Sequence, residues 1–208
     1  MRPALPVLVC VYVPLGVLLV AVKLAAPGEH ASALIEPEFS PAGSLTRGSL
    51  WIAGLVGWVW AVAACFIGVL ATRKHAALAA SRRLLAGAGL LTVIMFVDAL
   101  FQVHDPVFPD ATGLPAVLLL AVYGIAAAAW AWSNRAALAD TDLGVLAVAV
   151  VFFALWIAVK VGPGIPGKIP IASGAKLAGI AGWATYLTRT AWQAGRARRS
   201  APTTDSSS

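Results

Sequence analysis

The sequence predicts an all-α, polytopic integral membrane protein: a helical bundle of about six transmembrane helices with cytoplasmic N and C termini. Three observations lead to this prediction. Of the 208 residues, 60% are hydrophobic and only 12% are charged, whereas a soluble domain has roughly 25% charged residues. The hydrophobic residues form long runs rather than helical or alternating stripes. Finally, the basic residues gather in only some of the loops between these runs.

The hydrocarbon core of a bilayer is about 30 Å thick, and a helix needs roughly 20 residues to cross it. Six apolar segments have about this length. The expected spans are residues 4–22, 50–71, 84–103, 113–132, 143–159 and 171–188. The first of them follows Arg2 and is open to a second interpretation, a cleaved signal peptide. The apolar region of a signal peptide usually has only about 7 to 15 residues, which favours a membrane span.

The last segment, residues 171–188, has the weakest signal because it is rich in Gly and Ala and contains Lys176. We expect this lysine to extend towards the lipid headgroups. Gly174, Ala178 and Gly182 follow at four-residue spacing, which allows close packing against another span. The predicted domain organisation is one transmembrane domain over residues 1–190 and a basic, then disordered, cytoplasmic tail over residues 191–208.

Charge predicts the orientation of the bundle, because ten of the fifteen Lys and Arg residues fall on one side of it. These ten are Arg2, Arg73, Lys74, Arg82, Arg83, Arg135, Arg189, Arg196, Arg198 and Arg199. Positive residues of short loops stay on the cytoplasmic side, so both termini are expected there and the number of spans is even. The same residues predict contact with the lipid bilayer, in particular with anionic lipid at the cytoplasmic face. They are divided among membrane-flanking loops, so nucleic acid is not an expected partner.

Asp98 is the one acidic residue inside a predicted span. A carboxylate there costs several kcal/mol unless it is protonated, paired or hydrated. Along a continuous helix, Gln102 and Asp105 lie within about 40° of Asp98, which predicts a polar stripe rising to the outer surface. Two interpretations remain open: an acid that binds a proton or ligand, or a structural acid that bonds a neighbouring helix or pairs with Lys160.

The outer side also offers candidate metal ligands, His104 and His30, together with several carboxylates. Imidazole and carboxylate groups bind zinc, which makes a membrane-embedded, metal-dependent hydrolase with an extracytoplasmic site an alternative. No HExxH spacing is present. Asp98 followed six residues later by His104 resembles the acid-and-histidine pattern of membrane ceramidase-like hydrolases. The paired histidines that complete this pattern on a later span are absent from the sequence, so no activity is carried over.

The leading hypothesis is a non-enzymatic, multi-pass protein of the cell membrane that binds a small ligand, a lipid or a membrane protein partner. The binding site is expected in an outer polar cavity lined by Asp98 and Gln102, as in a small transporter or an accessory subunit. A purely structural or assembly role is a third reading. No catalytic triad or nucleotide fingerprint occurs, so no cofactor is predicted. Asp140 and Asp142 precede residues 143–159 and are expected to cap that helix.

Overall fold

The computed structural model describes residues 4–25, 49–162 and 168–200, and every regular element in these ranges is helical. The long helices are α1 (Ala4–Ala25), α2 (Ser49–Thr72), α3 (Ala79–Phe101), α5 (Ala116–Ser133), α7 (Leu143–Val161) and α8 (Lys168–Ser200). The short ones are the 3₁₀ helix η2 (Ala76–Leu78), the π-helix η3 (Val103–Val107), α4 (Phe108–Thr112) and α6 (Arg135–Ala139). The all-α class is therefore confirmed for the described part of the chain.

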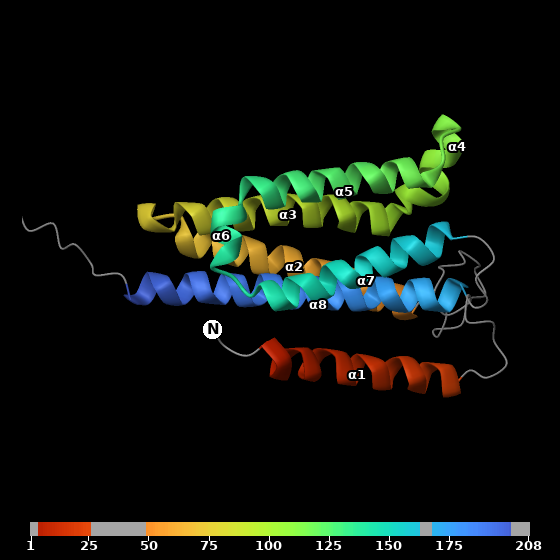
Figure 1. Cartoon of the computed structure of the whole chain (residues 1–208), viewed down its shortest axis with the longest axis horizontal. Helices are drawn as coiled ribbons and strands as arrows, with labels where there is room; N and C mark the ends of the chain where they lie inside the picture. The colour runs from red at the N-terminus through yellow and green to blue at the C-terminus, as the bar shows by residue number, and fades with distance from the viewer. Residues whose placement is uncertain (1–3, 26–48, 163–167, 201–208) are drawn as a thin grey trace, which may run out of the picture.

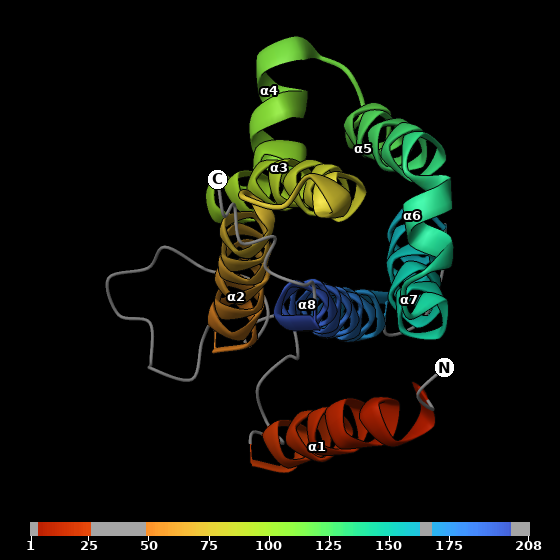
Figure 2. The same ribbon diagram turned by 90° about the vertical axis from the view of Figure 1, so that its left-hand side faces the viewer.

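Each of the six predicted apolar segments overlaps one of the six long helices, and their ends agree to within about five residues except at the end of α8. α3 begins at Ala79 and ends at Phe101, and α8 continues to Ser200, so the start of the expected tail is helical. Figure 1 shows these helices running side by side along one direction. Viewed along the bundle in Figure 2, α8 lies between α2 and α7, and α1 covers one side.

Four of the described helices are long and apolar enough to cross a membrane. They are Ile52–Thr72, Ala76–Phe101, Ala116–Ser133 and Leu143–Val161. Their outward faces carry large apolar side chains: Val56 is 62% exposed, Ile125 70% and Trp132 72%. Apolar surface this extensive is unfavourable in water but matches the hydrocarbon chains of a bilayer. The helices and their surface together indicate a membrane protein.

At the centre of the bundle, α8 packs closely against α7 and α1. A Cβ atom added to Gly182 would lie 3.2 Å from the Cα atom of Ala149 on α7, so the two backbones approach closely there. The hydroxyl of Tyr12 on α1 donates a hydrogen bond to the carbonyl oxygen of Ala178, at 3.2 Å. The expectation that small residues on this helix allow close contact is thus confirmed at Ala178 and Gly182.

An ion pair joins the N-terminal end of α7 to α8. The Arg189 guanidinium lies 2.6 Å from the carboxylate of Asp142. Asp142 occupies the N-cap position of α7, but its side chain makes no capping hydrogen bond. The prediction that this carboxylate caps the helix was therefore wrong. A full positive charge on the neighbouring helix is a stronger partner than the partial charge of a helix terminus.

Candidate functional site

The backbone after α3 turns His104 back towards Asp98. α3 ends at Phe101 because Gln102 adopts a left-handed conformation with φ 50°, and the Gln102 N–H bonds to the Asp98 carbonyl oxygen. Residues Val103–Val107 then form the π-helix η3. Pro106 has no N–H, so a regular α-helix could not continue through this segment without losing a hydrogen bond. The resulting turn places the His104 imidazole beside the Asp98 carboxylate.

Both carboxylate oxygens of Asp98 accept hydrogen bonds. Oδ2 lies 2.6 Å from Nδ1 of His104, and Oδ1 accepts the backbone N–H of the same residue at 2.8 Å. The Tyr123 hydroxyl on α5 donates to Oδ1 at 3.2 Å. Asp98 is 3% exposed and His104 5% exposed, so the pair is enclosed by protein. Burial of this kind is stable only when the charge is compensated and hydrogen bonded.

Two further side chains complete this Asp98 cluster, which we define as Asp98, His104, Tyr123, Trp156 and Lys176. The Trp156 ring on α7 meets the His104 ring at an angle of 89°, with 5.8 Å between the centroids. The Lys176 ammonium on α8 lies 5.0 Å from the Trp156 centroid and attracts the carboxylate of Asp98. The cluster thus joins α3, η3, α5, α7 and α8 near the end of the bundle that carries α4 (Figure 1).

The charges in the Asp98 cluster define what it can do chemically. The carboxylate and the Lys176 ammonium balance each other, so the cluster is neutral when His104 is neutral. An imidazole can accept a proton at one ring nitrogen and remain bonded to the carboxylate through Nδ1. The arrangement therefore has the components of a proton-binding site, with a carboxylate to stabilise the imidazolium ion.

The other predicted site residues have different surroundings. Gln102 is half-buried and ends α3, so the continuous helix on which the predicted polar stripe depends stops before it. Asp105 belongs to η3, but its side chain lies outside the described residues. Lys160 is half-buried in the last turn of α7, while the ion-pair partner of Asp98 is His104.

The proposed metal ligands are not assembled in the part of the chain that the structure describes. No group of three or more His, Cys, Asp and Glu side chains able to hold a metal ion occurs there. His30 lies outside the described residues. The metal site therefore stays a prediction.

Sequence reasoning missed three members of the Asp98 cluster. Tyr123 was a usable signal, because it is the one hydroxyl side chain within residues 113–132. Lys176 was expected to extend towards headgroups, whereas its ammonium lies against Trp156. Trp156 gave no signal, since aromatic residues are common near the ends of membrane helices.

The fold and this buried ionisable cluster define a helical membrane protein with a polar site near one end of its bundle. The chain belongs to the family described as Domain of unknown function (DUF8692), which matches residues 5–190. The matched region includes all five residues of the Asp98 cluster. No curated protein and no solved structure matches this chain.

Proposed function

We propose that this protein is a multi-pass protein of the cell membrane that binds a proton, or a small ligand coupled to it, at the Asp98 cluster. It acts as a small transporter or as an accessory subunit of one. The observation that carries this proposal is the 2.6 Å contact between the buried Asp98 carboxylate and the His104 imidazole in a largely apolar helix bundle. Retaining such a pair in a membrane costs stability, and intramembrane ionisable groups are commonly functional.

The proposed topology has six membrane spans, formed by α1, α2, α3, α5, α7 and α8, with both termini in the cytoplasm. The basic turn between α2 and α3 and the basic end of α8 support it, since both belong on the cytoplasmic side. The Asp98 cluster then lies near the outer leaflet. The proposed partners are the surrounding lipid and a membrane protein on which an accessory subunit acts.

Cysteine labelling tests this topology. A cysteine introduced by Ser44→Cys should react with a membrane-impermeant maleimide in intact cells, and one introduced by Ser200→Cys should react only after the membrane is opened. The native Cys10 and Cys65 lie within α1 and α2 and supply the unreactive background. The reverse pattern of labelling contradicts the orientation, and labelling of both cysteines contradicts the even number of spans.

Proton binding can be measured directly by NMR of protein labelled with ¹⁵N-histidine. The chain has three histidines, so His30→Gln and His75→Gln variants assign the His104 signal. We expect the His104 ring to take up one proton reversibly as the pH is lowered. Its Nδ1 resonance should move in Asp98→Asn but not in Asp110→Asn, which alters an exposed acid on α4. A ring that keeps one protonation state while the protein stays folded contradicts the proposal.

The alternative functions predict other results in simple measurements. A metal-dependent hydrolase should contain a stoichiometric metal, which elemental analysis of the purified protein detects, and chelators should inhibit it. A structural or assembly protein should keep its cellular effect in Asp98→Asn, provided that the variant is expressed normally. Either result would shift the assignment away from proton and ligand binding.

A further inference from the structure

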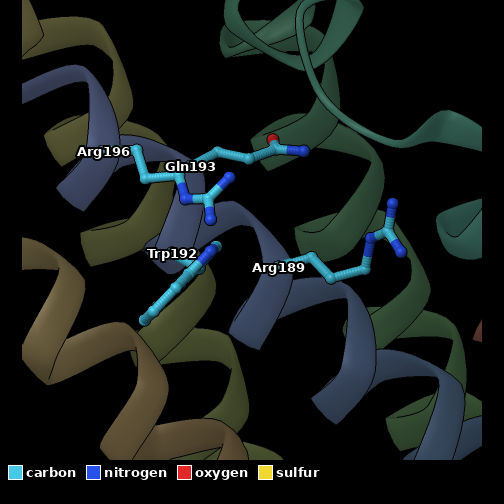
Figure 3. Close-up of a pocket in the computed structure, with 4 residues that line it drawn as sticks. All are labelled: Arg189, Trp192, Gln193 and Arg196. Carbon is cyan, nitrogen blue, oxygen red and sulfur yellow. The ribbon is translucent and has the colours of Figure 1, made fainter. Parts of the chain in front are cut away.

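The Asp98 cluster is enclosed by protein, so a proton or ligand reaches it only when a neighbouring element moves. Asp98 and His104 are 3% and 5% exposed. A cavity of about 410 Å³ near the C-terminal end of α8 does not lead to them; it is lined by Arg189, Trp192, Gln193 and Arg196 (Figure 3). Arg189 follows Lys176 by 13 residues, which is roughly 20 Å along a helix. Access to the cluster therefore depends on one of the helices around it.

Among these helices, α5 is the one least enclosed by protein. Only 6% of its apolar stretch is buried, against 22% for α7 and 39% for the span that includes α3. Leu120 is the one buried residue of Ala116–Ser133. In contrast, α8 lies between α2 and α7 and packs closely against α7 at Gly182 (Figure 2). Because burial of apolar surface stabilises packing, α5 moves at a lower cost than the other helices of the cluster.

The C-terminal half of α5 is anchored to the bundle through Trp130. The Trp130 indole donates a hydrogen bond to the carbonyl oxygen of Leu84 on α3, at 3.1 Å. Its ring also meets that of Trp183 on α8, with 5.7 Å between the centroids. Gly87 makes room for this ring, since a Cβ atom there would lie 2.7 Å from Cδ1 of Trp130. This half of the helix therefore provides a pivot.

The N-terminal half of α5 has two main attachments, and both are at the Asp98 cluster. Leu120 belongs to the same buried apolar group as Trp156 of α7. The Tyr123 hydroxyl donates the 3.2 Å hydrogen bond to the Asp98 carboxylate. Moving this half outwards therefore breaks one hydrogen bond to the cluster and uncovers one leucine.

The segment before α5 is suited to absorb such a movement. Gly113 has φ 70°, a conformation that glycine adopts without steric cost, and Pro115 at the N-cap is extended. Residues 113–115 are exposed, so a change in their backbone angles disturbs no buried contact. Hinges are commonly formed by a few residues of this kind at the end of a helix.

We propose that α5 is a gate over the Asp98 cluster. Its N-terminal half moves outwards about Trp130, the Tyr123 hydrogen bond to Asp98 breaks, and the His104 imidazole becomes accessible from outside the bundle. Tyr123 is thus a positioning residue that regulates access to the site. The functional meaning of the gate rests on the proposed binding at the Asp98 cluster, whereas the movement itself does not.

Chemical modification of His104 by diethyl pyrocarbonate, which reacts with neutral imidazole, tests this proposal. The reaction is followed by mass spectrometry on the full-length protein in lipid nanodiscs, with the half-buried His75 as the internal reference. We expect His104 to react slowly in the native protein and about three- to fivefold faster in Tyr123→Phe, because one hydrogen bond no longer holds the gate closed. This ratio should be the same over a range of pH, since opening multiplies the rate by one factor throughout.

Tyr12→Phe is the matched control for this variant. It also removes a single tyrosine hydrogen bond of 3.2 Å, but that bond joins α1 to Ala178 of α8. It should leave the reaction of His104 unchanged.

A second pair of variants weakens apolar packing and leaves the hydrogen bonds of the cluster in place. Leu120→Ala removes the buried leucine of α5 and should accelerate the reaction more than about tenfold. Leu138→Ala removes a leucine of similar burial from a different apolar group, on α6, and should leave the reaction of His104 unchanged.

Several results would contradict the gate. If His104 reacts no faster in Tyr123→Phe and Leu120→Ala than in the native protein, the cluster opens elsewhere. Equal increases in a variant and its control would indicate a general loosening of the bundle. A ratio that changes with pH would indicate altered protonation of His104, and a native His104 as reactive as His75 would mean that the cluster is already open. Failure of the proposed proton binding is detected separately, in the NMR titration.

Discussion

Replacing Asp98 by alanine should lower the free energy of unfolding more than any conservative substitution in the Asp98 cluster. The substitution removes the acceptor of three hydrogen bonds, two from His104 and one from Tyr123. Water cannot readily replace that acceptor, because Asp98 is only 3% exposed. Removing one partner of a buried ionic pair typically costs about 3–5 kcal/mol, and we expect a loss of this size in the free energy of unfolding.

Two milder substitutions separate the contributions of charge and shape. Asp98→Asn retains a carbonyl oxygen that can accept from the His104 backbone N–H and from Tyr123. Its amide donates to Nδ1 of His104 once the imidazole changes tautomer, so we expect a loss of about 1–2 kcal/mol. Tyr123→Phe removes only the 3.2 Å hydrogen bond to the carboxylate and should cost about 0.5–1 kcal/mol.

Unfolding by sodium dodecyl sulfate in mixed micelles, followed by circular dichroism, measures these free energies. The double variant of Asp98→Ala with Tyr123→Phe completes a cycle, in which a direct contact gives a coupling energy of at least about 0.5 kcal/mol. A loss of less than about 1 kcal/mol in Asp98→Ala would refute the buried pair, since no buried charge would then have been left without its partner. Strict additivity in the cycle would refute the contact with Tyr123.

Two further predictions concern the packing of α8 and use the same unfolding assay. Gly182→Ala places a methyl group against the backbone of α7 and should cost about 1–3 kcal/mol, whereas Gly124→Ala has no heavy atom within 4 Å and should stabilise α5 by about 0.5–1 kcal/mol. Effects of the same sign at both positions would contradict the close approach. Asp142→Asn breaks the ion pair between Asp142, which is 11% exposed, and Arg189, which is 20% exposed. It should lower the free energy of unfolding by about 1–3 kcal/mol, with little dependence on salt. The exposed Asp140→Asn should have almost no effect, and an equal loss there would show that the pair is not formed.

The positions of the long helices could be predicted from the sequence because bilayer thickness fixes the length of an apolar run. Asp98 could also be recognised locally, as a charge within such a run. The rotation of each helix about its axis could not, because packing against neighbours sets it. Tyr123 therefore bonds to Asp98, and Lys176 stacks on Trp156 of the same cluster, from helices whose facing sides no single segment reveals.

The contact between Asp98 and His104 could not be predicted for a different reason: it depends on where the regular helix stops. Counting 100° per residue assumes that α3 continues, but Gln102 takes a left-handed conformation that non-glycine residues seldom adopt. Pro106 was the visible warning, since a proline removes a hydrogen bond from the preceding turn. A break before Pro106 would have placed Asp105 off the expected stripe and allowed His104 to turn back.

The composition of α8 follows from its place among the other helices. Hydropathy measures how well a segment matches lipid. By that measure α5 is a clear span, and only 6% of its apolar stretch is buried by protein. α8 has the weakest hydropathic signal of the expected spans, yet Leu177, Tyr186 and Leu187 are buried in it. Two of its charged residues have partners on neighbouring helices: Lys176 lies over the Trp156 ring, and Arg189 pairs with Asp142. A helix enclosed by protein can carry such residues because its partners, and not the lipid, solvate them, so its modest hydropathy is compatible with a sixth span.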